Sequence, residues 1–283
     1  MKIAFWSNAN ETCGVSSNLA AISVASVIRY PYTVITMENR LCKNNLGKAY
    51  MGRLQGGAHS YAGNAFEVGN NYYEGDGMEG LMRKIYREEY NLKSFRRYLK
   101  EVIHKHLYYI PQSKIINDEI FDYEFDHCYP QLLQLIEEFA DICMIDTASY
   151  RSLSTKTILE DADLIVVNLC QNQIILEDFF LNYSSLIPKA IFIISKYDQR
   201  MFPNSRRIIQ EYDISPERIT VIPPNAMYQS AYTEGTVVEF ISRNYNCPKE
   251  STNYLFIQSI KKASFLIMKA AEQRVKQQEL QLC

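Results

Sequence analysis

Residues 2–29 read KIAFWSNANETCGVSSNLAAISVASVIR, and this stretch decides the fold. The apolar run at 2–6 predicts a buried strand, and the small apolar residues at 16–29 predict a helix. A tight loop between such a strand and helix is where mononucleotide-binding folds hold phosphates on the amides of the helix N-terminus. This loop, however, contains a single glycine, Gly14, and no lysine. The stretch therefore indicates a phosphate loop that lacks its main cation.

The same alternation of short apolar runs and helical patterns continues along the chain. We predict strands at residues 2–6, 32–37, 107–110, 141–145, 164–168, 190–195 and 219–222. We predict helices at residues 16–29, 78–90, 92–106, 129–139, 151–160, 174–187 and 204–211. Strands that are apolar throughout are typical of a parallel sheet that helices cover on both faces. The sequence predicts an α/β fold with a doubly wound, mostly parallel sheet, arranged as a single domain over residues 1–283.

The composition is that of an ordinary globular protein. Of the 283 residues, 47% are hydrophobic and 22% are charged, and the net charge is −2 at pH 7. Such a charge gives no global attraction to nucleic acids or to acidic lipids. The apolar segment at the N-terminus is too short for a secretory signal, and no run reaches the roughly 18 apolar residues that span a bilayer. We expect a cytoplasmic protein whose association with membranes, if any, is peripheral.

The cysteines and histidines show no disulfide or metal pattern. Seven cysteines are scattered without a CxxC pair, which makes a poor disulfide framework and a poor zinc site. Of the four histidines, His104 and His106 are two residues apart and would lie on opposite sides of a predicted helix. The sequence does not favour a metal site formed by these residue types.

Three segments stand out from the α/β pattern. Residues 47–80 hold nine of the eleven glycines, which predicts a loop insert, either a plain surface loop or a mobile lid or partner-binding segment. Residues 83–106 carry eight Lys or Arg against three Glu, interleaved with aromatic residues. We interpret them as the solvated face of two helices, with contact to DNA phosphates as the less favoured alternative. The spacing of apolar residues in 254–277 predicts a closing helix packed on the sheet.

The chain resembles the MinD/ParA group of deviant Walker-motif ATPases over nearly its full length. The most similar branch is the CpaE/TadZ type, which is associated with pilus assembly. Members open with K-G-G-x-G-K-T-T, where this chain has N-E-T-C-G-V-S-S at residues 10–17. Gly14, Ser16 and Ser17 match that pattern in kind. The resemblance implies a P-loop NTPase fold whose nucleotide site includes Gly14, Val15, Ser16 and Ser17.

The departures from that motif have physical consequences. Val15 replaces the second lysine, which neutralises charge on the transferred phosphoryl group. Asn10 replaces the first lysine, which in the family reaches the partner's nucleotide across a dimer. Glu11 replaces a glycine and adds bulk and negative charge where backbone approaches phosphate. The helix N-terminus, the amide of Gly14 and the hydroxyl of Ser16 are kept, which predicts weak nucleotide binding and poor hydrolysis.

Two acidic positions of the family are partly kept. The stretch FADICMIDTAS resembles Y-D-x-x-x-I-D-T-P-P and places Asp146 at the end of an apolar strand. The resemblance implies that Ser16 and Asp146 bind Mg²⁺ through oxygen atoms, the ligands that Mg²⁺ prefers. The alternative is that Asp146 only caps the helix that follows it. Glu38 is the only catalytic candidate, at the first acid of the family's D-x-D. Arg40 stands at the second acid and cannot act as a base at neutral pH.

Later motifs resemble the base-binding part of the family's site. IFIISKYDQR resembles a V-x-N-K-x-D-like segment, which implies that Lys196 and Asp198 lie near the base, with Ser195 in place of the usual Asn. ITVIPPNAMYQSAYTEG resembles the stretch that lines the adenine pocket, which adds Pro223 to the nucleotide-binding residues.

The joint change of three hydrolytic elements predicts a pseudo-ATPase. We expect a scaffold or positioning factor for a bacterial secretion, pilus or segregation system, a candidate homodimer that binds ATP or ADP with Mg²⁺ weakly or not at all. One alternative is a genuine slow ATPase whose cations come from a partner or from Lys43 or Lys48. A DNA-binding partition protein is less favoured. The sequence leaves the partner machinery, the oligomeric state and the role of residues 47–80 open.

Overall fold

The computed structural model describes residues 1–9, 12–39, 45–52, 77–112, 117–149 and 152–282. Within this part of the chain eight strands form one sheet, in the order β3-β4-β2-β5-β1-β6-β7-β8. Their bounds are β1 Lys2–Trp6, β2 Val34–Glu38, β3 Lys100–Ile103, β4 Leu107–Tyr109, β5 Ile142–Asp146, β6 Leu164–Leu169, β7 Ala190–Ser195 and β8 Ile219–Ile222. All neighbouring strands are parallel except β3 and β4. The predicted doubly wound, mostly parallel α/β sheet is confirmed.

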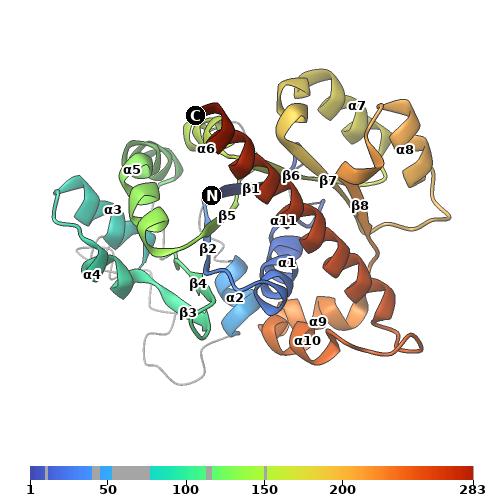
Figure 1. Ribbon diagram of the computed structural model, residues 1–283, viewed down its shortest axis with the longest axis horizontal. Helices are drawn as coiled ribbons and strands as arrows, with labels where there is room; N and C mark the ends of the chain where they lie inside the picture. Colours follow the sequence, from blue (N-terminus) through green and yellow to red (C-terminus); the bar gives the residue numbers. More distant parts are fainter. Residues whose placement is uncertain (10–11, 40–44, 53–76, 113–116, 150–151, 283) are drawn as a thin grey trace.

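Helices cover both faces of this sheet (Figure 1). One face is covered by α1 Val15–Arg29, α2 Asn45–Met51, α9 Ala226–Glu234, α10 Val237–Asn244 and α11 Tyr254–Leu282. The other is covered by α3 Met78–Tyr86, α4 Leu92–Phe95, α5 Asp118–Phe139, α6 Leu153–Asp161, α7 Gln173–Asn182 and α8 Ser205–Glu211. In β1, Ile3 and Phe5 pack on the first face, whereas Ala4 and Trp6 pack on the second. Because both faces are buried, the strand is apolar at every position.

Helix α1 is buried along almost its whole length between the sheet and α11, which crosses it in Figure 1. Small polar residues on α1 bond to the helices that cover it. The Ser23 hydroxyl lies 2.8 Å from the hydroxyl of Tyr50 in α2, and the Ser26 hydroxyl lies 2.9 Å from that of Ser264 in α11. Because α1 follows the carboxyl end of β1, its N-terminus lies at the carboxyl edge of the sheet, and these contacts hold the helix in place.

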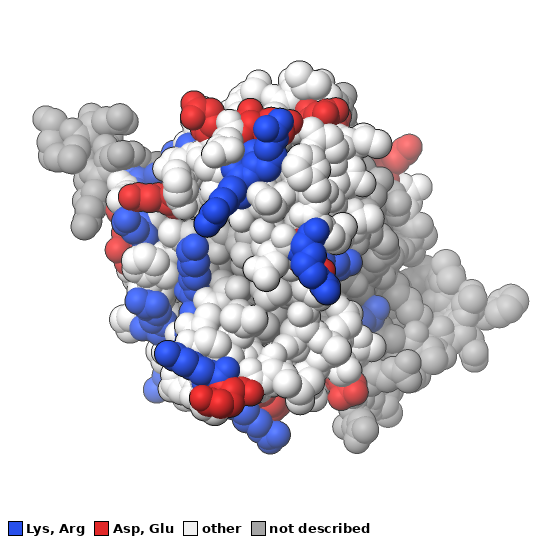
Figure 2. All heavy atoms as spheres, turned by 90° about the vertical axis from the view of Figure 1, so that its right-hand side faces the viewer, with Lys and Arg blue, Asp and Glu red and all other residues white. Residues whose placement is uncertain are grey.

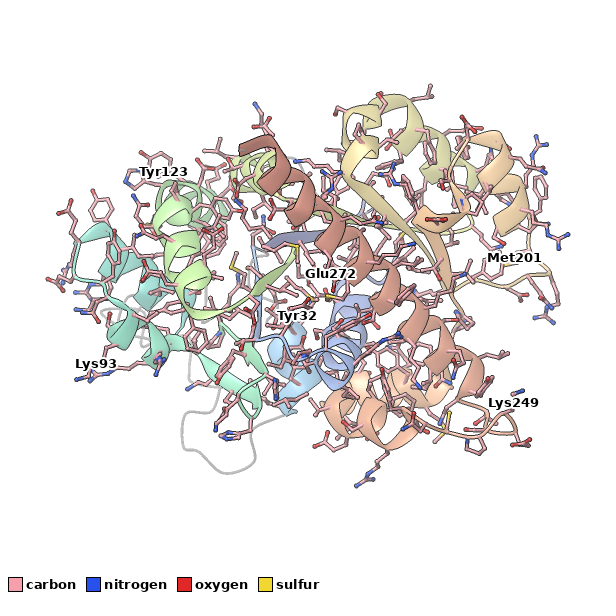
Figure 3. All side chains as sticks on the ribbon, in the orientation of Figure 1. Tyr32, Lys93, Tyr123, Met201, Lys249 and Glu272 are labelled. Atoms are coloured by element: carbon pink, nitrogen blue, oxygen red, sulfur yellow. The ribbon has the colours of Figure 1, made fainter. Side chains whose placement is uncertain are left out.

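The helix expected at residues 254–277 is α11. The side chains that carry its apolar spacing are all buried: Phe256, Ile260, Ala263, Ile267 and Ala271. A contact outside the core also involves α11, since the Tyr32 hydroxyl donates to the Glu272 carboxylate at 3.0 Å, and both side chains are labelled in Figure 3. Among the described residues, none of the helices combines the length and apolar character needed to cross a lipid bilayer.

The helix predicted at residues 92–106 is wrong. Helix α4 begins at the cap Asn91 but ends at Phe95, and a 3₁₀ turn, η1 Arg96–Tyr98, leads into β3. Strand β3 turns back at Lys105, whose φ is 63°, and pairs antiparallel with β4. The stretch VIHKHLYY is rich in β-branched and aromatic residues, and these favour a hairpin over a helix. Most basic residues of 83–106 therefore lie on α3, the four-residue helix α4, a 3₁₀ turn and an edge strand, and not on two long helices.

Lys93 of this basic segment points away from the body of the molecule in Figure 3. Lys84 is paired with Glu89 at 2.6 Å. On another face of the molecule, which Figure 2 shows, Lys and Arg side chains lie among uncharged surface and several Asp or Glu side chains. The solvated interpretation of residues 83–106 stays a prediction.

The loop predicted over residues 47–80 is corrected at both of its ends. Gly47 is buried inside α2, and Gly80 is buried inside α3. Their small size allows these two helices to pack closely. The sequence analysis assigned both glycines to a loop because glycine is so frequent in this segment. Residues 53–76 lie outside the described part of the chain, so the role of that segment stays a prediction.

Other differences concern helix ends and short helices. Helix α5 begins at Asp118, eleven residues before the predicted start, because Asn117 accepts hydrogen bonds from two amides of its first turn. Pro130 lies inside this helix and does not end it. Three helices of seven to nine residues, α2, α9 and α10, were not predicted.

Two glycines let α2 and α9 approach each other. Gly52 follows α2 with a φ of 65°, and Gly235 ends α9 with a φ of 77°. A Cβ atom on Gly235 would lie 1.9 Å from the Cα of Gly52. Only glycine at both positions permits this contact, which brings the ends of α2 and α9 together.

Candidate functional site

A cleft of about 550 Å³ lies at the carboxyl edge of the sheet. One side is the start of α1, from Gly14 to Asn18, and another is the end of β7 with Ser195 and Lys196. Residues 222–226, at the end of β8 and the start of α9, form a third side. Six of the seven residues that the sequence assigned to nucleotide binding line this cleft: Gly14, Val15, Ser16, Ser17, Lys196 and Pro223.

The start of α1 has the geometry of an anion-binding turn without the usual side-chain charge. Gly14 caps the helix with a φ of 62°, and its carbonyl accepts from the amide of Asn18 at 2.8 Å. The amides of a helix's first turn have no partner inside the helix, so they can face a ligand. Val15, which stands at the lysine position, is only 5% exposed. The turn can therefore offer amides and the Ser16 hydroxyl, but no ammonium group from that position.

Asn18 organises the floor of the cleft, and the sequence interpretation missed it. Its buried amide nitrogen donates to Oδ1 of Asn168 and to Oγ of Ser195, each at 2.8 Å. These bonds tie the first turn of α1 to β6 and β7. A buried polar side chain is stabilised only when its hydrogen bonds are made, so this network fixes the position of α1. The sequence did contain a signal for this role, since Asn18 is the one amide side chain in a helix of mostly small or apolar residues.

The far wall of the cleft is built around Tyr228. Its ring stacks on Phe256 with 4.6 Å between centroids, and its hydroxyl donates to the carbonyl of Ser17. Asn225 caps α9 by accepting from the amide of Tyr228 at 2.7 Å, and it donates to Asn253 at 3.0 Å. The wall therefore combines an aromatic ring with fixed amide groups, a surface suited to a flat, partly polar ligand.

Lys196 is the one charged side chain among the described residues that line the cleft. It has a left-handed backbone with a φ of 52°, which is uncommon for a residue other than glycine. Asp198 does not line the cleft. Its carboxylate pairs with Arg200 at 2.6 Å, and that hydrogen-bonded pair lowers the pKa of Asp198 to about 2. The assignment of Asp198 to a nucleotide site stays a prediction, and contact with a ligand would require it to leave Arg200.

Glu38 and Asp146 form a buried acidic pair beside the cleft. They are direct neighbours in the register of β2 and β5, and both are fully buried. Glu38 accepts from the hydroxyl of Tyr109 at 2.7 Å and from the amide of Asn45 at 3.0 Å. Burial, and then the charge of Asp146, raise the pKa of Glu38 to about 7. A carboxyl group with such a pKa is poised to exchange a proton near neutral pH.

Asp146 is not among the residues that line the cleft, whereas Ser16 is. The backbone after Asp146 is held by Asn39, which accepts from the amide of Ala148 at 2.6 Å and donates to the hydroxyls of Ser154 and Thr155, each at 3.2 Å. Among the described residues, no group of three or more His, Cys, Asp or Glu side chains is placed to hold a metal ion. The joint role of Ser16 and Asp146 as Mg²⁺ ligands stays a prediction, as does the catalytic role of Glu38.

Several expected residues lie outside the described part of the chain. Asn10, Glu11, Arg40 and Lys43 belong to this group, so their places relative to the cleft stay predictions. Lys48 is described and lies exposed on α2.

Several solved structures are similar to this chain over nearly its whole length. The septum site-determining protein MinD of Pyrococcus horikoshii OT3, complexed with Mg-ADP, matches with a TM-score of 0.66 at 14% identity, over 97% of this chain and 99% of that one. A ParA family ATPase from Chlorobium tepidum TLS matches with a TM-score of 0.66 at 14% identity, over 93% and 97% of the two chains. A chain of the MinC:MinD cell division protein complex of Aquifex aeolicus matches with a TM-score of 0.63 at 10% identity, over 95% of this chain and 96% of that one.

The fold is that of the MinD/ParA P-loop ATPases. No protein-family model matches the chain, and no curated protein matches it in sequence. At these identities the likeness shows the fold, and what the cleft binds has to be argued from its residues.

Proposed function

We propose that this chain is a MinD/ParA-like protein with a degenerate nucleotide site, and that it acts as a cytoplasmic scaffold or positioning factor. One observation carries the proposal. The cleft offers the amide turn of α1, but among the described residues its lining has apolar Val15 at the lysine position and Lys196 as its one cation. Phosphoryl transfer depends on several positive groups aimed at the transferring phosphate. Such a cleft favours weak nucleotide binding over turnover.

The cleft's chemistry is compatible with an adenine nucleotide. The ring of Tyr228 and the amide of Asn225 suit a base, and the α1 turn suits phosphate oxygens. The Ser16 hydroxyl and the Asp146 carboxylate are oxygen donors of the kind that Mg²⁺ takes, and bound Mg²⁺ would neutralise phosphate charge. The MinD neighbour from P. horikoshii carries Mg-ADP, which supports this choice of ligand.

The partner is proposed from the resemblance to the CpaE/TadZ branch, which points to a bacterial pilus, secretion or segregation machinery. The A. aeolicus neighbour belongs to a MinC:MinD cell division protein complex, so a protein partner suits this fold. A homodimer is a further candidate assembly.

The test compares nucleotide binding with hydrolysis. We expect the wild-type protein to bind Mg-ADP weakly in calorimetry and to hydrolyse ATP far more slowly than about 1 s⁻¹, an ordinary enzyme rate. Val15→Lys restores an ammonium group at the α1 turn and should increase the affinity for ADP. Ile28→Lys adds the same charge near the other end of α1 and should leave that affinity unchanged. ATP hydrolysis by the wild-type protein at about 1 s⁻¹ would contradict the proposed scaffold function.

A genuine slow ATPase is the second candidate, and the acidic pair favours it. Glu38 and Asp146 are both kept at adjacent strand ends, where an unused site would have no need of two buried carboxyl groups. In this case Glu38→Gln should abolish whatever slow hydrolysis is measured while leaving ADP binding intact.

A further inference from the structure

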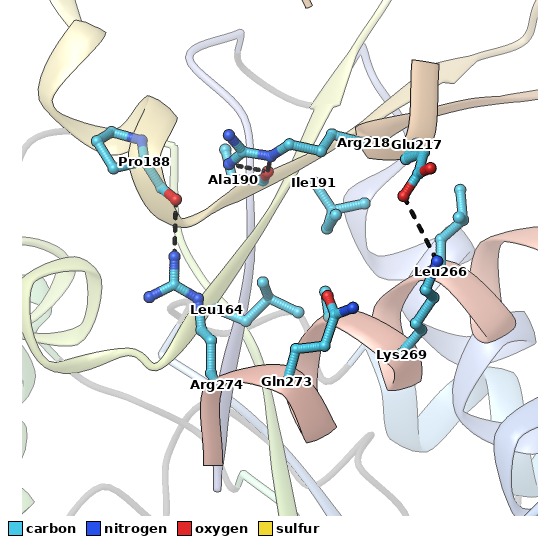
Figure 4. Close-up of a pocket in the computed structure, with 11 residues that line it drawn as sticks. Leu164, Pro188, Ala190, Ile191, Glu217, Arg218, Leu266, Lys269, Gln273 and Arg274 are labelled. Atoms are coloured by element: carbon cyan, nitrogen blue, oxygen red, sulfur yellow. Dashed lines mark hydrogen bonds and ion pairs between the residues drawn. The ribbon is translucent and has the colours of Figure 1, made fainter. Parts of the chain in front are cut away.

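A second cavity lies at the opposite edge of the sheet from the cleft. Its volume is about 190 Å³, and Leu164, Ala190 and Ile191 line it at the starts of β6 and β7. A second side is formed by Glu217 and Arg218 of the 3₁₀ helix η3 Pro216–Arg218, and α11 forms a third (Figure 4). Because these parallel strands begin here and end near the cleft, the length of the sheet separates the two sites.

Positive charge predominates around this cavity. Arg218, Lys269 and Arg274 line it, and Glu217 is the one acid among the described lining residues. Glu217 lies 3.4 Å from the ammonium group of Lys269, and its side chain is 79% exposed. In the part of the chain that the structure describes, neither Arg218 nor Arg274 forms an ion pair with a carboxylate. The cavity therefore has two guanidinium charges that are not balanced locally.

Both guanidinium groups reach the same short stretch of backbone. Arg218 donates to the carbonyl of Ala190 from Nε at 3.0 Å and from a terminal nitrogen at 2.6 Å, and also to the carbonyl of Ile187. Arg274 donates to the carbonyl of Pro188 at 2.7 Å from α11 (Figure 4). Each guanidinium carries five N–H donors. The three bonds of Arg218 fix the plane of its guanidinium group, the single bond of Arg274 anchors one nitrogen, and both groups keep other donors available.

The charges are close enough to act on one another. Burial, and then the charge of Arg274, lower the pKa of Arg218 and the pKa of the neighbouring Lys189. The acids of residues 160–163 act on Lys189 in the opposite direction, but Asp161 is already paired with Lys2 at 3.0 Å. An anion between the two arginines would relieve this repulsion.

We propose that this cavity binds a small oxyanion of phosphate chemistry between the guanidinium groups of Arg218 and Arg274. Guanidinium groups bind paired oxygens of a phosphate in a bidentate manner, which a single ammonium group does not. The apolar side chains of Leu164, Ile191 and Leu266 also line the cavity, so part of its wall is apolar. Charge-assisted hydrogen bonds are strong in such surroundings. This inference is independent of the nucleotide cleft.

The test is a titration of the full chain with sodium phosphate at pH 7, followed by thermal unfolding, with sodium chloride at matched ionic strength as reference. We expect phosphate to raise the melting temperature saturably and beyond the effect of chloride. Arg274→Gln should weaken phosphate binding at least about tenfold, since it removes a hydrogen-bonded charge. Lys269→Gln changes an exposed side chain and should weaken phosphate binding less. It replaces Arg274→Gln as the test variant if Arg274→Gln fails to fold.

Two control variants separate this site from other basic groups. Arg206→Gln removes an exposed charge on α8, and Lys196→Gln removes the charge of the cleft. Both should keep the wild-type response to phosphate. The proposal is overturned if phosphate acts no differently from chloride, if neither Arg274→Gln nor Lys269→Gln changes its affinity, or if Lys196→Gln abolishes the response.

The phosphate group could belong to a free ion or to a lipid headgroup. Sedimentation with phosphatidylcholine vesicles, with and without phosphatidic acid, distinguishes these sources. We expect no vesicle binding, because the cavity is small and bounded by α11, which assigns the site to a free ion. Binding to phosphatidic acid that Arg274→Gln abolishes would support the same site with a lipid headgroup as its source.

Discussion

At the scale of single residues, Glu38 makes stability depend on pH. Its folded pKa of about 7 lies above the ordinary value of 4.5, so the folded protein holds this proton more tightly than the unfolded chain does. Stability should therefore fall as the pH rises from about 4.5 to 7, by on the order of 3 kcal/mol at most. Urea denaturation at several pH values measures this loss.

The thiol of Cys13 changes stability with pH in the opposite direction to Glu38, and does so at higher pH. A hydrogen bond from Cys170 lowers the pKa of Cys13 to about 6 against the effect of burial, so its contribution to stability grows as the pH rises above 6. The contribution of Cys13 is present in both the wild type and Glu38→Gln, whereas that of Glu38 is present only in the wild type. The difference in stability between the two proteins at each pH therefore reports Glu38 alone. If the variant and the wild type lose stability in parallel between pH 5 and 7, the proton is not held by Glu38.

The sequence predicted the residues of the cleft better than the contacts that hold them. Gly14, Val15, Ser16 and Ser17 are consecutive, so one strand–loop–helix pattern places them together. Asn18 was missed because its partners, Asn168 and Ser195, are 150 and 177 residues away in the chain. No local pattern reports a bond over such a separation.

At the scale of elements, the contact of α2 with α9 gives a matched pair of glycine substitutions. Gly235→Ala would place a methyl group 1.9 Å from the Cα of Gly52, whereas a Cβ on Gly14 meets nothing within 4 Å. Both glycines have a positive φ, so both changes carry the backbone strain of about 1–2 kcal/mol. We expect Gly235→Ala to cost clearly more than Gly14→Ala in chemical denaturation. Equal losses would show that the two backbones can move apart freely.

Strand elements were predictable where burial on both faces left only apolar residues. β1, β7 and β8 have the predicted bounds, because their runs contain no competing helical period. β3 was missed because Lys100 and Glu101 are exposed at the sheet edge, and charged residues followed by aromatic ones also suit a helix. β8 is the other edge strand, but it is largely buried and its sequence shows this, whereas the exposure of β3 becomes evident only in the assembled sheet.

At the scale of the whole molecule, assembly should not depend on nucleotide. In the family that the chain resembles, the first loop lysine bridges two subunits through the bound nucleotide, and Asn10 has neither the charge nor the length for that bridge. We expect the mass in solution to be the same with and without Mg-ATP. Asn10→Ala should also leave it unchanged. Light scattering that shows dimers only in the presence of Mg-ATP would restore a nucleotide switch.

The burial of α1 also has a kinetic consequence. A helix that lies on the surface can open by itself, and its amides then exchange hydrogen with solvent long before the molecule unfolds. Helix α1 is enclosed by the sheet, α10 and α11, so its central amides can open only when those layers separate. Deuterium uptake at residues 19–27 should therefore proceed at the rate of global unfolding and slow in proportion to added stability. Rapid uptake there in native buffer would mean that the covering layer of helices detaches as a unit.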